Sequence, residues 1–133
     1  MLGRNYRFSV NNNSGVTLDS VTIQARRWKF DSSGALSFDS EAEVFNETSI
    51  SASATAWTED TAVDNSTDKW IGADLEIVID PPASSATGLV SVQIQRSTDG
   101  GTTWPDDGNG ESVAGYYFNA YASGTAITLH VQI

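Results

Sequence analysis

Apolar and polar residues alternate along most of the chain, which is the pattern of strands that bury one face. Nowhere do apolar residues recur at helical spacing over a useful length. The cleanest alternation lies within 71–79, where the odd-numbered residues are all apolar. Further alternating runs lie within 6–10, 21–30, 36–38, 42–44, 50–56, 90–94, 114–121 and 127–133. The pattern therefore predicts about eight strands and no helix.

The run within 21–30 changes phase partway along. Val21, Ile23 and Ala25 share one parity, whereas Trp28 and Phe30 fall on the other. One extra residue in a strand moves the following side chains to the opposite face. We therefore predict a β-bulge near residues 25–27, which would place Trp28 in the core.

The connections between these runs favour one antiparallel domain. They are rich in Gly, Asn, Asp, Ser and Pro, and residues 58–69 read as a polar, acidic loop. Parallel strands need long crossovers, usually helical, and no such segment is visible. The 133 residues suit one domain. We expect residues 1–133 to form a single all-β domain, an antiparallel β-sandwich of jelly-roll or immunoglobulin-like type.

Charge is distributed unevenly along the sequence. Seven Lys and Arg stand against 17 Asp and Glu, a net charge of −10 that disfavours nucleic acid and anionic membranes as partners. Residues 1–30 hold five of the cations and only Asp19 among the acids. These cations are candidates for a partner interface: Arg4, Arg7, Arg26, Arg27 and Lys29. The alternative is a solvated face with cross-strand ion pairs.

Catalytic chemistry has little support in the sequence. Cys is absent, which excludes disulfides, thiolate zinc sites and a cysteine nucleophile. The only His, His130, alternates with Leu129 and Val131 and is expected on a polar face. No nucleophile and base are singled out by spacing, so we predict no catalytic residues and no enzyme activity.

Two kinds of ligand remain open alternatives. Oxygen-bearing side chains gather around a glycine-rich loop and could hold calcium, although an acidic solvated loop is the simpler interpretation: Asp99, Asp106, Asp107, Asn109 and Glu111. Trp57 and Trp70 flank the 58–69 loop and are candidates for exposed platforms that stack on a surface glycan. No other cofactor is predicted.

Residues 97–104 read Ser-Thr-Asp-Gly-Gly-Thr-Thr-Trp. This segment resembles the Asp-box pattern S-x-D-x-G-x-T-W, with a match at each specified position: Ser97, Asp99, Gly101, Thr103 and Trp104. Asp99 is expected to accept backbone N–H bonds and Gly101 to take a positive φ. Asp boxes are structural turns in sialidases, remote from the catalytic site. The resemblance implies a structural turn and no sialidase activity, because the repeats of a propeller are missing.

A wider segment, residues 90–111, resembles segments in small virion proteins of tailed bacteriophages. The resemblance implies a non-enzymatic structural subunit, a capsid decoration (cement) or tail protein. Its partners would be other virion proteins and copies of itself, with no nucleic acid and no membrane. We expect localisation in the virion, assembled in the host cytoplasm, because no secretion signal is visible. The alternative is a carbohydrate-binding β-sandwich module.

Overall fold

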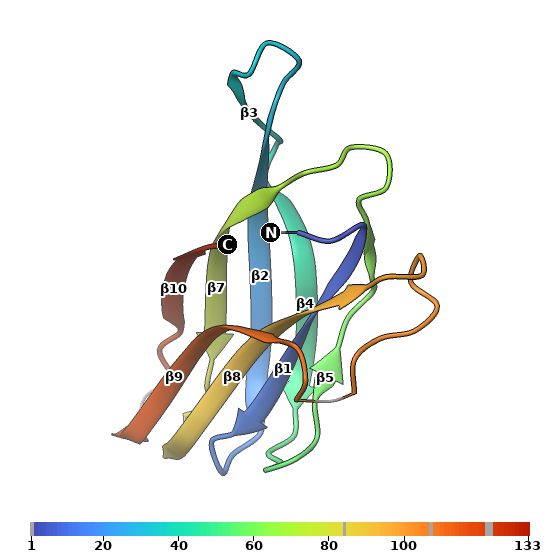
Figure 1. The fold of residues 1–133 in the computed structure, drawn as a ribbon. Coiled ribbons are helices and arrows are strands. Elements are labelled where there is room, and N and C mark those ends of the chain that lie inside the picture. Colours follow the sequence, from blue (N-terminus) through green and yellow to red (C-terminus); the bar gives the residue numbers. More distant parts are fainter. Residues whose placement is uncertain (1, 84, 107, 122–123) are drawn as a thin grey trace.

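The computed structural model describes residues 2–83, 85–106, 108–121 and 124–133. Within these ranges the chain is all-β, and Figure 1 shows two antiparallel sheets packed face to face, as the alternation predicts. The strands are β1 (Asn5–Asn13), β2 (Leu18–Phe30), β3 (Leu36–Phe38), β4 (Ala42–Ile50), β5 (Thr58–Glu59), β6 (Val63–Asp64), β7 (Gly72–Asp80), β8 (Ala86–Ser97), β9 (Glu111–Tyr121) and β10 (Ile127–Gln132). In the described residues we find no helix that is long and apolar enough to cross a membrane.

Each sheet has a long central strand, β8 or β2, that pairs with a long antiparallel strand on both sides. In the first sheet the order is β5-β1-β8-β9, and β6 also pairs with β1. In the second sheet the order is β10-β7-β2-β3, and β4 also pairs with β2. Strands β1 and β2 follow each other in the chain but lie in different sheets, so the basic N-terminal segment is divided between the two layers.

The core lies between the inward faces of the two sheets. Its largest fully buried side chains include Tyr6 and Phe8 from β1, Ile77 and Ile79 from β7, and Phe118 from β9. In β7 every second residue from Ala73 to Ile79 is buried and the residues between them are half-buried, so the predicted period of two is confirmed for this strand.

Two predicted boundaries are wrong. Residues 51–57 form no strand, and the chain leaves β4 at Ile50, just after Ser49 at a φ of 55°. The alternating residues there are alanines with Ser and Thr between them, which bury too little apolar surface to hold a strand in a sheet. Conversely, the predicted loop 58–69 contains the short strands β5 and β6, which pair with β1.

The predicted bulge at residues 25–27 is also wrong. Strand β2 pairs with β7 without interruption from Ser20 to Trp28. The irregularity lies in β4, where Val44 is the extra residue beside β2. Trp28 and Phe30 therefore keep the parity of the outer face of β2, and Trp28 is half-buried on that face rather than in the core.

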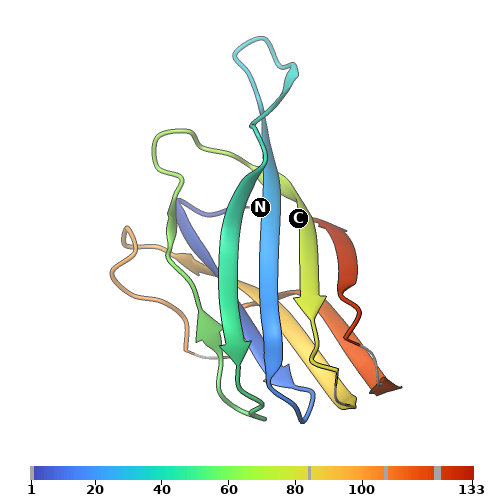
Figure 2. The same ribbon diagram turned by 180° about the vertical axis from the view of Figure 1, so that it is seen from behind.

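The end of β2 continues past the body of the sandwich. Residues 29–38, which we call the arm, form a hairpin of β2 and β3 that projects from one end of the molecule in Figures 1 and 2. Strand β7 begins only at Gly72, opposite Trp28, so no strand of the described residues pairs with the arm on that side.

Candidate interaction surface

The arm is closed by a turn that its own side chains hold together. Asp31 Oδ1 accepts hydrogen bonds from the backbone N–H of Ser33 at 2.8 Å and of Ala35 at 3.0 Å, and from Ser33 Oγ at 2.6 Å. These bonds, first that of the Ser33 hydroxyl, lower the pKa of Asp31. Gly34 supplies the positive φ, 82°, that the turn requires. The arm is therefore a defined hairpin rather than a loose loop.

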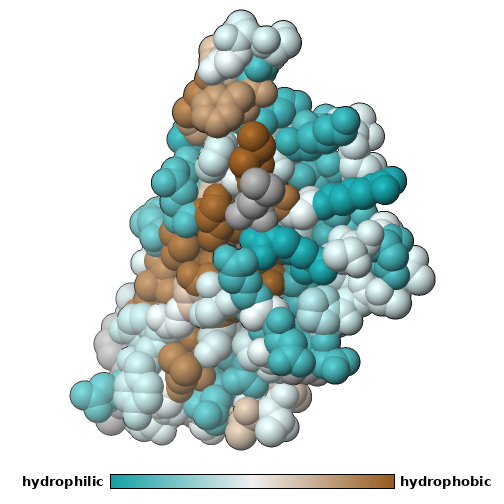
Figure 3. Space-filling view, in the orientation of Figure 1, coloured by the Kyte–Doolittle hydropathy of each residue, from teal (hydrophilic) through white to brown (hydrophobic). Residues whose placement is uncertain are grey.

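One face of the arm is apolar and exposed. Because Trp28 pairs with Phe38 and Phe30 pairs with Leu36, all of these side chains lie on the same side of the hairpin. Phe30 is 57% exposed, Leu36 51% and Phe38 46%. Figure 3 shows tan and brown side chains on the arm, continuing over the flank beside β7 and β10. A contiguous exposed apolar patch of this kind is a candidate interaction site.

Aromatic and cationic contacts order this apolar face. The rings of Trp28 and Phe30 meet edge to face with centroids 6.4 Å apart. The Arg26 guanidinium lies 4.7 Å from the centroid of Phe38. Such contacts restrict the orientations of the rings on this face.

The opposite face of the arm is tied to the body of the sandwich. Lys29 Nζ donates a hydrogen bond to the carbonyl of Asp68 at 2.8 Å and lies 4.3 Å from the centroid of the Trp70 ring. Arg27 forms an ion pair with Asp39 and lies 5.8 Å from the same ring. The base of the arm is thus braced against the loop that precedes β7.

Sequence reasoning did not find the apolar face of the arm. Its signal was the change of parity at Trp28 and Phe30, which we interpreted as a bulge. The same change is expected when a strand leaves the core and turns an apolar face outward. Leu36 and Phe38, which share the parity of their partners across a tight turn, complete the signal.

The basic residues predicted as an interface do not form one cluster. Three of them have carboxylate partners within the chain, so the cross-strand alternative describes them: Arg7–Glu59, Arg26–Asp74 at 3.3 Å and Arg27–Asp39. Arg7 lies in the first sheet, whereas Arg26, Arg27 and Lys29 lie at the arm end of β2. Arg4 is exposed and lies between the chain start and β1.

The 97–104 segment forms a hydrogen-bonded turn around Asp99. Asp99 Oδ1 accepts from the backbone N–H of Thr103 at 2.9 Å and Oδ2 accepts from the Thr103 hydroxyl at 2.6 Å. Ser97 Oγ donates to Asp99 Oδ1 at 2.7 Å and accepts from the N–H of Gly101 at 2.8 Å. These bonds, first those of Thr103, hold the pKa of Asp99 well below its ordinary value.

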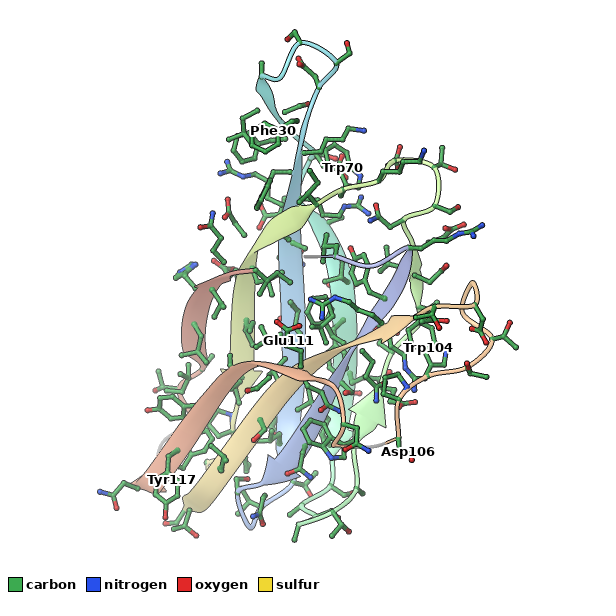
Figure 4. All side chains as sticks on the ribbon, in the orientation of Figure 1. Phe30, Trp70, Trp104, Asp106, Glu111 and Tyr117 are labelled. Carbon is green, nitrogen blue, oxygen red and sulfur yellow. The ribbon has the colours of Figure 1, made fainter. Side chains whose placement is uncertain are left out.

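Gly101 and Trp104 complete this turn. Gly101 has a φ of 91°, in the region that favours glycine. The half-buried Trp104 ring lies 4.6 Å from the Arg7 guanidinium of β1, and Figure 4 shows it at the base of the loop. The contacts of the segment are therefore those of a structural turn fastened to the first sheet.

The predicted glycan platform is wrong for Trp70. Its side chain is only 8% exposed, because it packs beneath Arg27 and Lys29 at the base of the arm. Trp57 is half-buried beside the first sheet. The two indoles do not offer a pair of open faces for stacking on a sugar.

The predicted calcium ligands are largely engaged in other contacts. Asp99 is held by its own turn, and Glu111 forms an ion pair with Arg96 that lowers the pKa of Glu111. Asp106 and Asn109 are exposed, and Asp107 lies outside the described residues. In the part of the chain that the structure describes, no three His, Cys, Asp or Glu residues are grouped to hold a metal ion.

His130 lies on the outer face of the second sheet. Its side chain is exposed, and its Nε2 is 3.9 Å from Glu76 Oε2 on the neighbouring strand β7. The predicted polar face is therefore confirmed for this residue, whose pairing with Glu76 is a cross-strand contact.

Comparison with known proteins gives no further assignment. No protein-family model matches the chain, and neither a curated protein nor a solved structure matches it with significance.

Proposed function

We propose that this chain is a non-enzymatic structural subunit of a tailed-bacteriophage virion, a capsid decoration or tail protein that acts through protein–protein assembly. The proposal joins the resemblance of residues 90–111 to such proteins with the surface of the folded chain. Its partners are copies of itself and other virion proteins.

The apolar face of the arm is the observation that carries this proposal. A hairpin that projects from the sandwich and exposes Phe30, Leu36 and Phe38 has no role in the core of its own domain. Exposed aromatic and aliphatic side chains in one patch lose contact with water when a partner covers them. The arm is therefore the surface by which the subunit is held in an assembly.

Charge favours a second copy as the partner of the arm. Three cations lie where the arm joins the body: Arg26, Arg27 and Lys29. The outer face of the second sheet carries Glu43 and Glu76 beside Gln24, midway along β2, and Asp80 opposite Ser20 at the far end. Unlike charge on the arm end and on this acidic face favours contact between the arm of one copy and the second sheet of the next.

The test of the proposal is the protein content of purified particles. Virions are isolated from cells in which a phage genome encodes this chain, and each protein is quantified by mass spectrometry. We expect this chain at a constant copy number relative to the major capsid or tube protein in every preparation. Gradient-purified virions that lack the chain would refute the proposal.

A further inference from the structure

A pocket of about 440 Å³ opens beside the base of the arm, between the N-terminal segment and the loop that precedes β7. The buried side chains of Leu2 and Trp70, with the half-buried Ile71, form its apolar floor. The exposed side chains of Arg4 and Lys69 lie at its rim. It therefore offers an apolar surface bordered by positive charge.

Hydrogen bonds of Asn65 hold together the two segments that line this pocket. Its buried side chain donates to the carbonyls of Gly3 at 3.0 Å and Trp70 at 2.9 Å, and it accepts from the N–H of Trp70 at 2.8 Å. These bonds join the N-terminal segment to the 65–70 loop. The backbone next to Arg4 and Lys69 is therefore held in place by the fold.

The backbone of Lys69 is strained at this position. Its φ is 55°, which is uncommon for a residue with a long side chain. A hydrogen bond of 3.1 Å from its N–H to the carbonyl of Asn65 helps to hold this conformation. Strain of this kind persists where the surrounding structure enforces it, and it is concentrated at functional sites.

Arg4 and Lys69 form no ion pair with a carboxylate of the described residues, although the chain is strongly acidic. The other cations bind carboxylates or, for Lys29, a backbone carbonyl. For the side chains of Arg4 and Lys69 we find no hydrogen bond or ion pair within the described ranges. Asp64 is a neighbouring acid whose pKa is lowered by hydrogen bonds from Ser66 first and also by the charge of Arg4. The chain has 17 carboxylates against seven cations. Two cations without an ion pair beside one pocket can therefore bind an anion from outside the chain.

We infer that this pocket binds an acidic peptide segment of a partner protein, with carboxylates paired to Arg4 and Lys69 and an apolar side chain on the floor. The combination of an apolar floor and paired cations fits a peptide that carries both kinds of side chain. A nucleic acid is disfavoured, because the net charge of −10 repels a long run of phosphates. This inference is independent of the arm and goes beyond the proposed function.

The first test is selection of a random peptide library on the folded full-length chain. We expect enrichment of peptides in which Asp or Glu stands next to a large apolar residue. Failure to enrich any sequence, or enrichment of sequences without acidic residues, overturns the inference. Preference for a single-stranded oligonucleotide over the selected peptides overturns it as well.

The second test titrates the most enriched peptide by calorimetry. The double variant Arg4→Gln/Lys69→Asn removes both rim charges, and Asn tolerates the positive φ at position 69. We expect its dissociation constant to rise about tenfold or more, because two charge-assisted contacts are lost. Both side chains are exposed, so thermal unfolding should show a retained fold.

A matched control separates the pocket from the overall charge. The variant Thr48→Glu/Thr128→Glu lowers the net charge by the same two units at exposed positions of the second sheet. We expect it to change the dissociation constant by less than about twofold, since distant exposed charges are screened. Equal losses in both variants would assign the effect to net charge and overturn the inference. The arm variant Phe30→Ser/Leu36→Ser should bind the peptide like the unmodified chain, even if the arm contacts no partner.

Discussion

At the scale of single residues, the 97–104 turn depends on one carboxylate. Asp99 receives bonds from Ser97, Thr102 and Thr103, although it is fully exposed to water. Because those donors face the ionised form, the folded chain holds Asp99 ionised at a pH where an unfolded chain protonates it. The stabilising effect is thus fully present above the unfolded pKa, about 4, and is lost as pH falls through the lower folded pKa.

This linkage predicts the acid behaviour of Asp99→Asn. We expect the variant to have a lower Tm than the unmodified chain at pH 7, with the difference shrinking as pH falls below about 4. Calorimetric or circular-dichroism melts between pH 7 and pH 2 measure it. Asp106→Asn, an exposed carboxylate in the following loop, is the control and should leave Tm nearly unchanged. A Tm difference that stays constant across this range would contradict the role of ionised Asp99.

Position 72, where the arm joins the body, has no room for a side chain larger than that of glycine. A Cβ at this position would lie 2.3 Å from Cζ2 of Trp28 and 2.4 Å from the carbonyl oxygen of Ile133. We therefore predict that Gly72→Ala lowers the free energy of unfolding by about 1–3 kcal/mol, since the indole and the backbone must both shift. Urea unfolding measures the loss.

Gly115→Ala is the matched control for this substitution. It also lies in a strand, but its Cβ would meet Leu89 Cδ1 at 3.4 Å and the carbonyl oxygen of Val90 at 3.6 Å, which are ordinary contacts. We expect no loss of stability there. If both glycine variants unfold alike, the close approach of Trp28 to Gly72 does not determine the cost.

At the scale of elements, the role of the arm can be tested by substitutions that leave the sandwich folded. Phe30 and Leu36 pair across the hairpin and are both more than half exposed. We predict that Phe30→Ser/Leu36→Ser abolishes self-association of the chain in sedimentation velocity, because the apolar contact surface is removed. The free energy of unfolding should change by no more than about 0.5 kcal/mol per site, since neither side chain is in the core.

Leu89 and Tyr117 provide the control for this prediction. They also pair across two strands and are 40% and 68% exposed. Figure 4 places Tyr117 at the end of the molecule opposite Phe30. Leu89→Ser/Tyr117→Ser removes a similar apolar pair and should leave self-association intact. An unmodified chain that remains monomeric at high concentration, or equal losses in both variants, would exclude the arm as the contact.

The elements that sequence predicts well are those whose identity rests on large inward residues. In β7, Leu75, Ile77 and Ile79 alternate without interruption, and their burial follows from their own pattern. The alternation of Ala52, Ala54 and Ala56 carries the same period, but these side chains are too small for burial to stabilise a strand. Alternation of apolar and polar residues therefore predicts a strand only when the alternating apolar side chains are large.

The candidate site shows the same division between local and distant causes. The Asp99 turn follows from eight neighbouring residues, so its hydrogen bonds could be anticipated from the segment alone. The burial of Trp70 depends on Arg27 and Lys29, which reach it from another part of the chain. The pocket at Arg4 and Lys69 depends on Asn65 joining two segments far apart in sequence. No local pattern reports such contacts.

At the scale of the whole molecule, charge and shape both favour head-to-tail contact between copies. The arm lies at one end, beside Arg26, Arg27 and Lys29, while the outer face of β7 carries Glu76 midway along the strand and Asp80 at the far end. A contact between unlike ends is heterologous, so it repeats from copy to copy and closes into a ring or continues as a filament. Either outcome suits a subunit that covers a shell or lines a tube.

The charge difference between the arm end and the acidic face of the second sheet predicts how salt affects self-association of the chain. Raising NaCl from 0.1 M to 1 M shortens the Debye length from about 10 Å to about 3 Å, which screens attraction between the arm end and the acidic body. We expect the self-dissociation constant, measured by sedimentation at both concentrations, to rise roughly tenfold. The Phe30→Ser/Leu36→Ser variant should stay monomeric at both, because charge alone supplies too little contact. Association that is unchanged or tighter at 1 M would mean that apolar contact acts without the charge asymmetry, and a head-to-tail arrangement would then lose its electrostatic basis.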